Sequence, residues 1–276
     1  MIDCISKNAY LNNSIIPAEQ AQNALFTGNI TVYEVIRIIN GCPLFINDHL
    51  VRLQKSASLL NVKLWYSSTQ IQSIISEFIN HESITNGNLK LQFIVDNNRL
   101  LFLLYQSQHS YPTLEMYQNG VITKTLDLER DNPNAKNVQS FHKVAQSFIK
   151  DHNLYEAILV DKNGDITEGS KSNIFFIKGN SVFTALASDV LLGITRQYVI
   201  DASKSVGLTV EERKISKKEL PTFKAAFISG TSPKILPIKK IDEYSYKTDN
   251  KHLQNLMFEL DEMIQQYIEK HNFTNK

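Results

Sequence analysis

Apolar runs of strand length recur along this chain, and helix patterns separate them without a strict strand–helix–strand alternation. In the first hundred residues the runs are ITVYEVIRII (30–39), LKLQFIV (89–95) and RLLFLLY (99–105). Two helix patterns lie between them, one from His49 and one behind a Ser/Thr cap at 67–69. Such mixing predicts an α+β fold rather than a parallel, doubly wound sheet.

The second half repeats the mixture with more strands. Helix patterns are expected at about 140–152, after LLGITR, and from about 251 to the end, with the strand runs EAILVD, NIFFIK, SVFTA, TVEERKI and AAFISG before and between them. Around SQHSYPT (107–113) the apolar pattern lapses. We therefore expect two domains, a small one over 1–110 and a larger one over 111–276.

Charge and cysteine content narrow the class of function. The 29 basic and 28 acidic residues leave a net charge of +1, which gives no electrostatic reason to expect nucleic acid or an anionic membrane as a partner. No apolar run has the length of a membrane span, and the first residues lack the layout of a signal peptide. Two cysteines, Cys4 and Cys42, form no CxxC pair. A cytoplasmic protein is expected.

Three short stretches carry groups that bind phosphate. LLGIT (191–195) places Gly193 and Thr195 at an expected helix start, where free backbone N–H groups and a hydroxyl point one way. SGTS (229–232) ends a strand pattern, and Arg52 in HLVRL offers a charged fork. Each stretch taken singly has a simpler explanation: LLGIT as a helix cap, SGTS as a turn, and Arg52 as an arginine in contact with water.

The order of the motifs gives them more weight together. YEVIR, HLVRL, a lysine in a polar loop, YEAILVDKNGDITEGSKSN, LLGITR and FISGTSPKILPI follow one another from about residue 25 to 240. In this order they resemble the class IV aminotransferases, the pyridoxal phosphate enzymes of fold type IV. That family includes branched-chain and D-amino acid aminotransferases and aminodeoxychorismate lyase. The resemblance implies a small α/β N-terminal domain, a larger barrel-like C-terminal domain, pyridoxal 5'-phosphate as cofactor and a homodimer.

The loop DITEGSKSN (165–173) carries an acid where a turn needs only glycine and small polar residues. In the family, the acid of this TEG motif pairs with the pyridine nitrogen, so the resemblance gives Glu168 that role. A carboxylate there keeps the nitrogen protonated, and the ring can then accept electrons from the substrate. The alternative is a turn glutamate in water. Ser170 and Ser172 either lie near the ring, as in the family, or satisfy the turn backbone.

The phosphate and ring contacts also come from the resemblance. Arg52 matches the arginine of the family's H-x-x-R-L helix, and Leu191 matches a leucine that packs on a face of the ring; ordinary core packing is equally compatible with Leu191. The remaining positions match the family's helix start and its GT turn, and they are Gly193, Ile194, Thr195, Gly230 and Thr231.

The Schiff-base lysine must present a neutral amine that attacks the aldehyde and later moves a proton. Lys136 in NPNAKN precedes the YEAI strand by the interval that the family shows, so the resemblance makes it the catalytic lysine. The residues after it depart from the family's usual LN or SN. Lys143 is the rival, but it lies within a helix pattern that is typical of a solvated lysine.

The strand VYEVIR supplies the substrate side in the family. Tyr33 matches an aromatic residue there, and strand alternation places Tyr33, Val35 and Arg37 on one face. Arg37 could instead form a structural ion pair with Glu34 or with another acid. Lys90 aligns with an arginine of the branched-chain enzymes, although a lysine facing water at a strand start is the alternative.

No histidine shows metal-ligand spacing, so no metal site is expected, and His49 is expected to cap its helix or fill the core. Glu34-Val35 resembles the aminotransferases, whereas the lyases tend to have Thr-Thr at this point. The leading hypothesis is therefore an aminotransferase that moves an amino group from an amino acid to a 2-oxo acid. The alternatives are a lyase of the aminodeoxychorismate type, which eliminates pyruvate, and a non-catalytic relative that binds pyridoxal phosphate.

Overall fold

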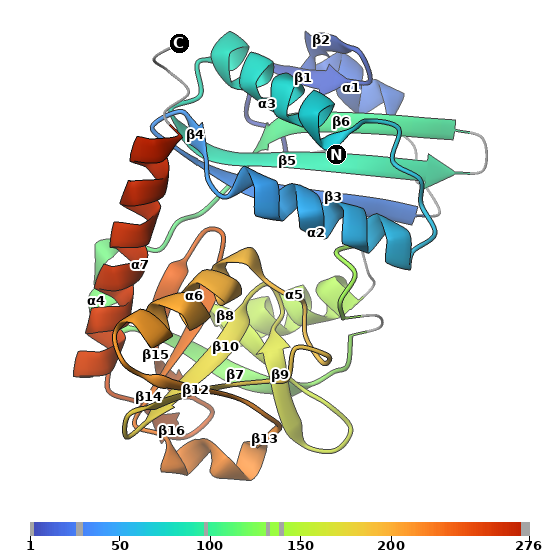
Figure 1. Ribbon diagram of the computed structural model, residues 1–276. Helices are drawn as coiled ribbons and strands as arrows, with labels where there is room; N and C mark the ends of the chain where they lie inside the picture. Colours follow the sequence, from blue (N-terminus) through green and yellow to red (C-terminus); the bar gives the residue numbers. More distant parts are fainter. Residues whose placement is uncertain (1–2, 26–29, 97–98, 131–132, 138–140, 272–276) are drawn as a thin grey trace. The chain divides into compact units, whose positions relative to one another are not determined.

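The computed structural model describes residues 3–25, 30–96, 99–130, 133–137 and 141–271. The chain divides into two compact units (Figure 1). As far as they are described, Met1–Ser110, Ala135–Val138 and Ile264–Lys276 make up the first unit, and Tyr111–Asn134 and Gln139–Met263 make up the second. The sequence-based division assigned every residue after 110 to the second domain.

The first unit is built on one antiparallel sheet with the strand order β2-β1-β6-β5-β3-β4. Its strands are β1 (Asn8–Leu11), β2 (Ser14–Pro17), β3 (Ile30–Ile39), β4 (Cys42–Pro43), β5 (Asn86–Asp96) and β6 (Arg99–Ser107). The expected hairpin between β5 and β6 is confirmed, with Asp96 paired to Arg99. The two residues of its turn lie outside the described part of the chain.

The helices of this unit are α1 (Ala18–Ala24), α2 (Ile46–Leu59) and α3 (Ser68–Glu82). The expected cap of α3 is confirmed, because Ser67 and Gln70 form a reciprocal capping box. The expected start of α2 at His49 is wrong, since the helix begins at Ile46. Phe45 adopts a left-handed conformation at the N-cap, which turns the chain directly from β4 into the helix.

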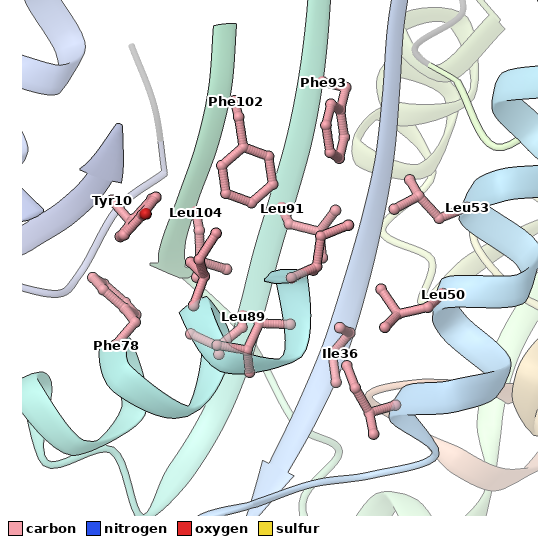
Figure 2. Packing of buried hydrophobic residues seen from close by; sticks show 14 of the residues in the cluster. Tyr10, Ile36, Leu50, Leu53, Phe78, Leu89, Leu91, Phe93, Phe102 and Leu104 are labelled. Atoms are coloured by element: carbon pink, nitrogen blue, oxygen red, sulfur yellow. The ribbon is translucent and has the colours of Figure 1, made fainter. Parts of the chain in front are cut away.

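The core of the first unit lies between α2, α3 and one face of the sheet (Figure 2). Leu89, Leu91 and Phe93 of β5 belong to this core. The residues between them point to the other face of the sheet, where Ile94 is part of a second buried cluster. Leu50 and Leu53 of α2 pack against the core face of the sheet. Burial of each such side chain contributes roughly 1.5–3 kcal/mol to folding, so the sheet carrying β3 is a rigid base.

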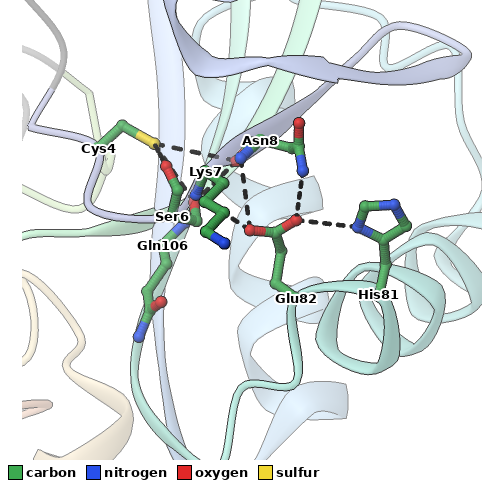
Figure 3. Close-up of polar contacts among 7 residues, drawn as sticks. All are labelled: Cys4, Ser6, Lys7, Asn8, His81, Glu82 and Gln106. Atoms are coloured by element: carbon green, nitrogen blue, oxygen red, sulfur yellow. Dashed lines mark hydrogen bonds and ion pairs between the residues drawn. The ribbon is translucent and has the colours of Figure 1, made fainter.

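Glu82 at the end of α3 ties the N-terminal segment to this base (Figure 3). Its carboxylate accepts hydrogen bonds from the backbone N–H groups of Lys7 and Asn8 and from Asn8 Nδ2. His81 Nδ1 lies 2.9 Å from the same carboxylate. The residues just before β1 are thereby held against the helix layer.

The second unit contains a mixed sheet with the strand order β12-β11-β10-β14-β15-β7-β8-β9-β13, and β16 pairs with β15. Its strands are β7 (Val121–Asp127), β8 (Glu156–Val160), β9 (Asp165–Gly169), β10 (Asn173–Lys178), β11 (Ser181–Thr184), β12 (Thr209–Glu212), β13 (Ile215–Ser216), β14 (Ala225–Gly230), β15 (Lys234–Ile241) and β16 (Tyr244–Ser245). Its helices are α4 (Leu114–Asn119), α5 (Phe141–Asp151) and α6 (Ile194–Ser205), with a 3-10 turn at Lys217–Thr222. The last helix, α7 (Lys251–Lys270), belongs to this unit up to Met263 and to the first unit from Ile264.

One face of this sheet encloses an apolar core to which Ile174, Phe176, Ala226 and Ile228 contribute from β10 and β14. The opposite face of the same two strands carries Phe175 and Phe227, whose rings stack 5.0 Å apart. The α+β fold class with a small antiparallel domain and a larger strand-rich domain is confirmed. Within the described residues, no helix is long and apolar enough to span a membrane.

Candidate active site

Three buried polar side chains meet between β3 and α2. Glu34 accepts a hydrogen bond from Arg52 Nε at 2.7 Å and from Arg52 Nη2 at 2.5 Å, and His49 Nδ1 lies 2.8 Å from Glu34 Oε2. All three residues are at least nine-tenths buried. The sequence left open that Arg52 is a water-exposed arginine, and its burial shows that it is not. Glu34 faces α2, so the ion pair of Glu34 is with Arg52 and not with Arg37. Of the two alternatives for His49, the helix cap is wrong and the buried position in the interior is confirmed.

Burial raises the pKa of Glu34, but the charge of Arg52 and the hydrogen bonds from Arg52 and His49 outweigh it and hold that pKa well below its usual range. For His49 the balance is the reverse. Burial lowers the pKa of His49, and the hydrogen bond and charge of Glu34 only partly oppose that effect. The cluster therefore contains a charged Glu34–Arg52 pair and a neutral imidazole at neutral pH.

The segment around Lys136 is fastened to the same two elements. Its backbone carbonyl accepts a hydrogen bond from Tyr33 N at 3.2 Å, and its backbone N–H donates to Ser56 Oγ at 3.1 Å. Asn137 forms a bridge to Val32, on the edge of β3 that the short β4 leaves open. Lys136 Nζ lies 5.1 Å from the centroid of the Tyr33 ring. Lys143, the rival, is part of α5 in the second unit.

The residues that are expected to bind the substrate lie on the other face of β3. Because Lys90 pairs in register with Val35, its side chain shares a face with Tyr33, Val35 and Arg37. Lys90 Nζ is 5.8 Å from the Tyr33 ring centroid. It is not a lysine facing water at a strand start, since its side chain is 23% exposed and lies 3.7 Å from Asp3 Oδ1.

Tyr105 completes this group from the neighbouring strand β6. It pairs in register with Lys90, and its hydroxyl donates to Asp3 Oδ1 at 2.7 Å. Burial and the nearby Asp3 raise the pKa of Tyr105 above its usual range, so the phenol stays protonated. The face therefore combines cationic and phenolic side chains beside Tyr33, which suits a small anionic ligand.

In the second unit Glu168 is buried rather than solvated. Its exposed fraction is 3%, and its Oε2 accepts a hydrogen bond from the backbone N–H of Leu191 at 3.1 Å. Arg130 Nη1 donates to Oε1 at 3.3 Å, and the Arg130 guanidinium lies 5.5 Å from the ring centroid of Phe141. The alternative of a turn glutamate in water is wrong.

The loop that follows Glu168 is organised by a second buried carboxylate, Glu156. Glu156 accepts hydrogen bonds from the hydroxyls of Ser170 and Ser172, at 2.6 and 3.0 Å. The backbone N–H groups of Ala157, Ser170 and Lys171 also donate to it. Both serine hydroxyls therefore bind the Glu156 carboxylate and not the turn backbone. Gly169 is needed because a Cβ there would overlap Ser172 Oγ.

The expected helix start after LLG is confirmed, since α6 begins at Ile194 with Gly193 as N-cap. Asn173 Nδ2 donates to the carbonyl of Leu191, and a Cβ at Gly193 would overlap Asn173 Oδ1. No side chain among the described residues caps the first turn, so its N–H groups remain available for an anion. Gly230 and Thr231 stand at the end of β14, as expected.

Several residues of these clusters were not foreseen, namely Glu156, Arg130, Ser56, Asn173, Tyr105 and Asp3. The sequence does contain a signal for Glu156. This acid is the first residue of a fully buried strand, where a carboxylate needs hydrogen-bond donors. Within the described residues, no group of three or more His, Cys, Asp or Glu side chains is arranged to hold a metal ion.

A family model described as amino-transferase class IV matches residues 31–241, which is most of the chain and includes the elements that carry both clusters. This chain belongs to the class IV aminotransferase family. Among curated relatives of this class IV chain, the D-alanine aminotransferase of Bacillus licheniformis is 30% identical over 230 residues, covering 76% of this chain and 78% of the relative. The aminodeoxychorismate lyase of Bacillus subtilis (strain 168) is 24% identical over 239 residues, covering 80% of each.

Solved structures confirm the fold of this family member. The branched-chain amino acid aminotransferase of Escherichia coli superposes with a TM-score of 0.86 at 20% identity, and the match covers 94% of this chain and 95% of that one. The branched-chain amino acid aminotransferase of T.th., solved with pyridoxamine 5'-phosphate, gives the same TM-score of 0.86 at 20% identity and covers 96% of this chain and 98% of that one. The two-domain fold of these enzymes, with the smaller antiparallel sheet and the larger curled sheet, is thus the fold of this class IV chain.

Proposed function

We propose that this chain is a pyridoxal phosphate-dependent aminotransferase that moves an amino group from an amino acid to a 2-oxo acid. Membership of class IV and the likeness to an aminotransferase with bound pyridoxamine 5'-phosphate support the cofactor. The observation that carries the proposal is the setting of Lys136. Its backbone is hydrogen-bonded on both sides, to Tyr33 and Ser56, and its amine is directed to the Tyr33 ring.

Each unit, taken by itself, carries groups that suit the phosphate of this cofactor. In the second unit, the uncapped first turn of α6 offers N–H groups, and Thr195 and Thr231 offer hydroxyls. Gly193 lets the chain pass close to Asn173, since a Cβ there would overlap Asn173 Oδ1. In the first unit Arg52 offers a guanidinium whose Nε and Nη2 are already oriented by Glu34.

Bound pyridoxal phosphate supplies an aldehyde that captures amines and a ring that accepts electrons. Lys136 would hold the cofactor through Nζ and move the substrate proton at that atom. Glu168 would keep a proton on the ring nitrogen, with its carboxylate oriented by Leu191 N–H and Arg130. Leu191 would pack on the ring. Ser170 and Ser172 would act on the cofactor through the loop that they hold with Glu156 rather than by direct donation.

The substrate would lie on the face of β3 and β5 that carries Tyr33, Val35, Arg37 and Lys90. Two cations there suit the carboxylates of an amino acid and a 2-oxo acid. The protein would be a homodimer, as the family resemblance implies, and its cysteine content fits work in the cytoplasm. Light scattering on an active preparation tests the dimer, and a monomer at working concentration would exclude it.

The direct test of the activity is a screen of amino donors, in both D and L forms, against 2-oxoglutarate and pyruvate with the purified protein and added cofactor. Formation of the new amino acid and of the donor's 2-oxo acid in equal amounts is expected. A protein that binds the cofactor covalently but transfers no amino group from any donor would overturn the aminotransferase proposal.

One observation favours a second candidate, a lyase that releases pyruvate by β-elimination. The lyase of Bacillus subtilis aligns over 80% of this chain, against 76% for the D-alanine aminotransferase of Bacillus licheniformis. Pyruvate release from aminodeoxychorismate without any amino acceptor separates the two reactions. Glu34 favours the aminotransferase, because it occupies the place where the lyases tend to carry threonine and is committed to the ion pair with Arg52.

A further inference from the structure

The hydroxyl of Ser229 is buried and has no hydrogen-bond partner within the part of the chain that the structure describes. Ser229 is 1% exposed and lies in β14, one residue before the Gly230–Thr231 turn. Burying a hydroxyl without a partner is costly, and native proteins seldom keep one without a reason. Neither the fold nor the family resemblance assigns Ser229 a role.

Strand pairing shows where this hydroxyl lies. Ser229 is directly opposite Asn173 in the antiparallel pair of β14 and β10, so the two side chains project from the same face about 5 Å apart. The preceding pair on that face, Phe175 and Phe227, has its rings stacked, which confirms the shared face. Asn173 in turn donates to the carbonyl of Leu191. Ser229 is therefore directed to the chain that leads into α6.

The start of α6 is the positive end of a helix of 12 residues. Gly193, its N-cap, packs so closely on Asn173 that a Cβ would overlap Asn173 Oδ1. The first turn has no side-chain cap among the described residues. The strand that carries this unpaired hydroxyl thus packs against α6. The first N–H groups of the helix are donors, and the hydroxyl can donate as well.

We propose that Ser229 Oγ is a further ligand of the cofactor phosphate, donating to a phosphate oxygen directly or through one water. This inference rests on the proposed function, in which Thr195 and Thr231 supply the phosphate hydroxyls. It has a definite thermodynamic consequence. The Ser229 hydroxyl destabilises the protein when phosphate is absent and stabilises it when phosphate is bound, because only the bound form gives it a partner.

The test compares Ser229→Ala with a matched serine whose hydroxyl is already satisfied. Ser203 is fully buried in α6, and its Oγ donates to the carbonyl of Val199 at 2.7 Å. Both variants are made in the full-length chain. Three quantities are measured: the melting temperature after removal of cofactor, the dissociation constant of pyridoxal phosphate, and that of inorganic phosphate.

For Ser229→Ala we expect an unchanged or higher melting temperature without cofactor, and about tenfold weaker binding of both pyridoxal phosphate and inorganic phosphate. For Ser203→Ala we expect a lower melting temperature and unchanged affinities. A lower melting temperature of cofactor-free Ser229→Ala, or affinities equal to those of the unaltered chain, would overturn the inference alone. If the unaltered chain binds neither ligand, the proposed function fails as well.

Discussion

Arg52 donates two hydrogen bonds to Glu34, one to each carboxylate oxygen, and this fork is buried between β3 and α2. A bidentate pair fixes the plane of the guanidinium as well as its position. Lysine at position 52 would keep the charge but lose the fork. In the proposed function Arg52 binds the cofactor phosphate, and Glu34 would then be the residue that orients it.

Glu34→Gln should lower both stability and cofactor affinity. An amide leaves the buried charge of Arg52 uncompensated, and breaking a buried pair from one side costs about 3 kcal/mol of unfolding free energy, which urea unfolding measures. Glu82→Gln is the matched control, since Glu82 accepts three hydrogen bonds from Lys7 and Asn8 away from the candidate site (Figure 3). It should lose stability but keep its affinity for pyridoxal phosphate. Equal affinities of the two variants would contradict the orienting role of Glu34.

The same cluster predicts how stability depends on pH. Burial lowers the pKa of His49 below its ordinary value of 6.5, so the unfolded chain binds a proton that the folded chain does not. The free energy of unfolding should therefore fall as the pH falls below 6.5. Glu34, whose pKa is held below its ordinary 4.5, adds a second loss only at lower pH, as the carboxylate becomes protonated.

His49→Asn should remove the first of these two losses. The unfolding free energies of the variant at about pH 7.5 and about pH 5.5 should then differ less than those of the unaltered chain. His81→Asn is the control, because His81 is exposed beside Glu82. A decline that persists unchanged in His49→Asn would show that another group titrates in this range.

Lys136→Ala should abolish covalent attachment of the cofactor, while Lys143→Ala should keep it. The backbone of Lys136 is held by Tyr33 and Ser56, whereas Lys143 is a helical residue of α5. Intact mass after borohydride reduction in the presence of pyridoxal phosphate measures the attachment. A cofactor adduct that survives in Lys136→Ala and disappears in Lys143→Ala would transfer the role to the rival lysine.

Glu168→Gln should fold and still bind the cofactor but lose most of its turnover. The neutral amide cannot hold a proton on the ring nitrogen, and loss of such an electrostatic contact costs on the order of 3 kcal/mol in the rate, or about a hundredfold in kcat. Leu191 N–H can still donate to the amide oxygen, so the loop should keep its shape. A kcat within a few-fold of the unaltered enzyme would exclude the proposed role of Glu168.

The local parts of this site could be predicted from sequence, and the pairings across the fold could not. The helix start at Ile194 and the strand end at Gly230 follow from short-range turn and cap signals. The partner of Glu34 depends on which face of β3 meets α2. The pair of Arg130 and Glu168 joins residues 38 positions apart, which no local pattern reports. Sequence periodicity places a side chain on a face, but only tertiary packing selects its partner.

The last prediction concerns the substrate face, where Lys90 and Arg37 are the proposed carboxylate ligands. Lys90→Ala and Arg37→Ala should each raise the KM for the amino donor by roughly tenfold and change kcat less, since a lost charged hydrogen bond weakens binding by about that factor. The structure also predicts a substitution near Lys90 that should lower the KM for the donor. Asp3 lies 3.7 Å from Lys90 Nζ and competes with a substrate carboxylate for it.

Asp3→Asn should therefore lower the KM for the donor, by at most a few-fold because the pair is partly exposed. Asp3 also accepts a hydrogen bond from the Tyr105 hydroxyl. The double variant Asp3→Asn, Lys90→Ala should show the KM of Lys90→Ala alone where Asp3 affects the donor through the ammonium group, and a different KM where it acts through Tyr105. Steady-state kinetics with one donor at saturating 2-oxo acid gives the KM of the unaltered chain, of Asp3→Asn, of Lys90→Ala and of the double variant. If Asp3→Asn raises KM, Asp3 contacts the substrate itself, and Lys90 is then a partner of Asp3 rather than a ligand of the carboxylate.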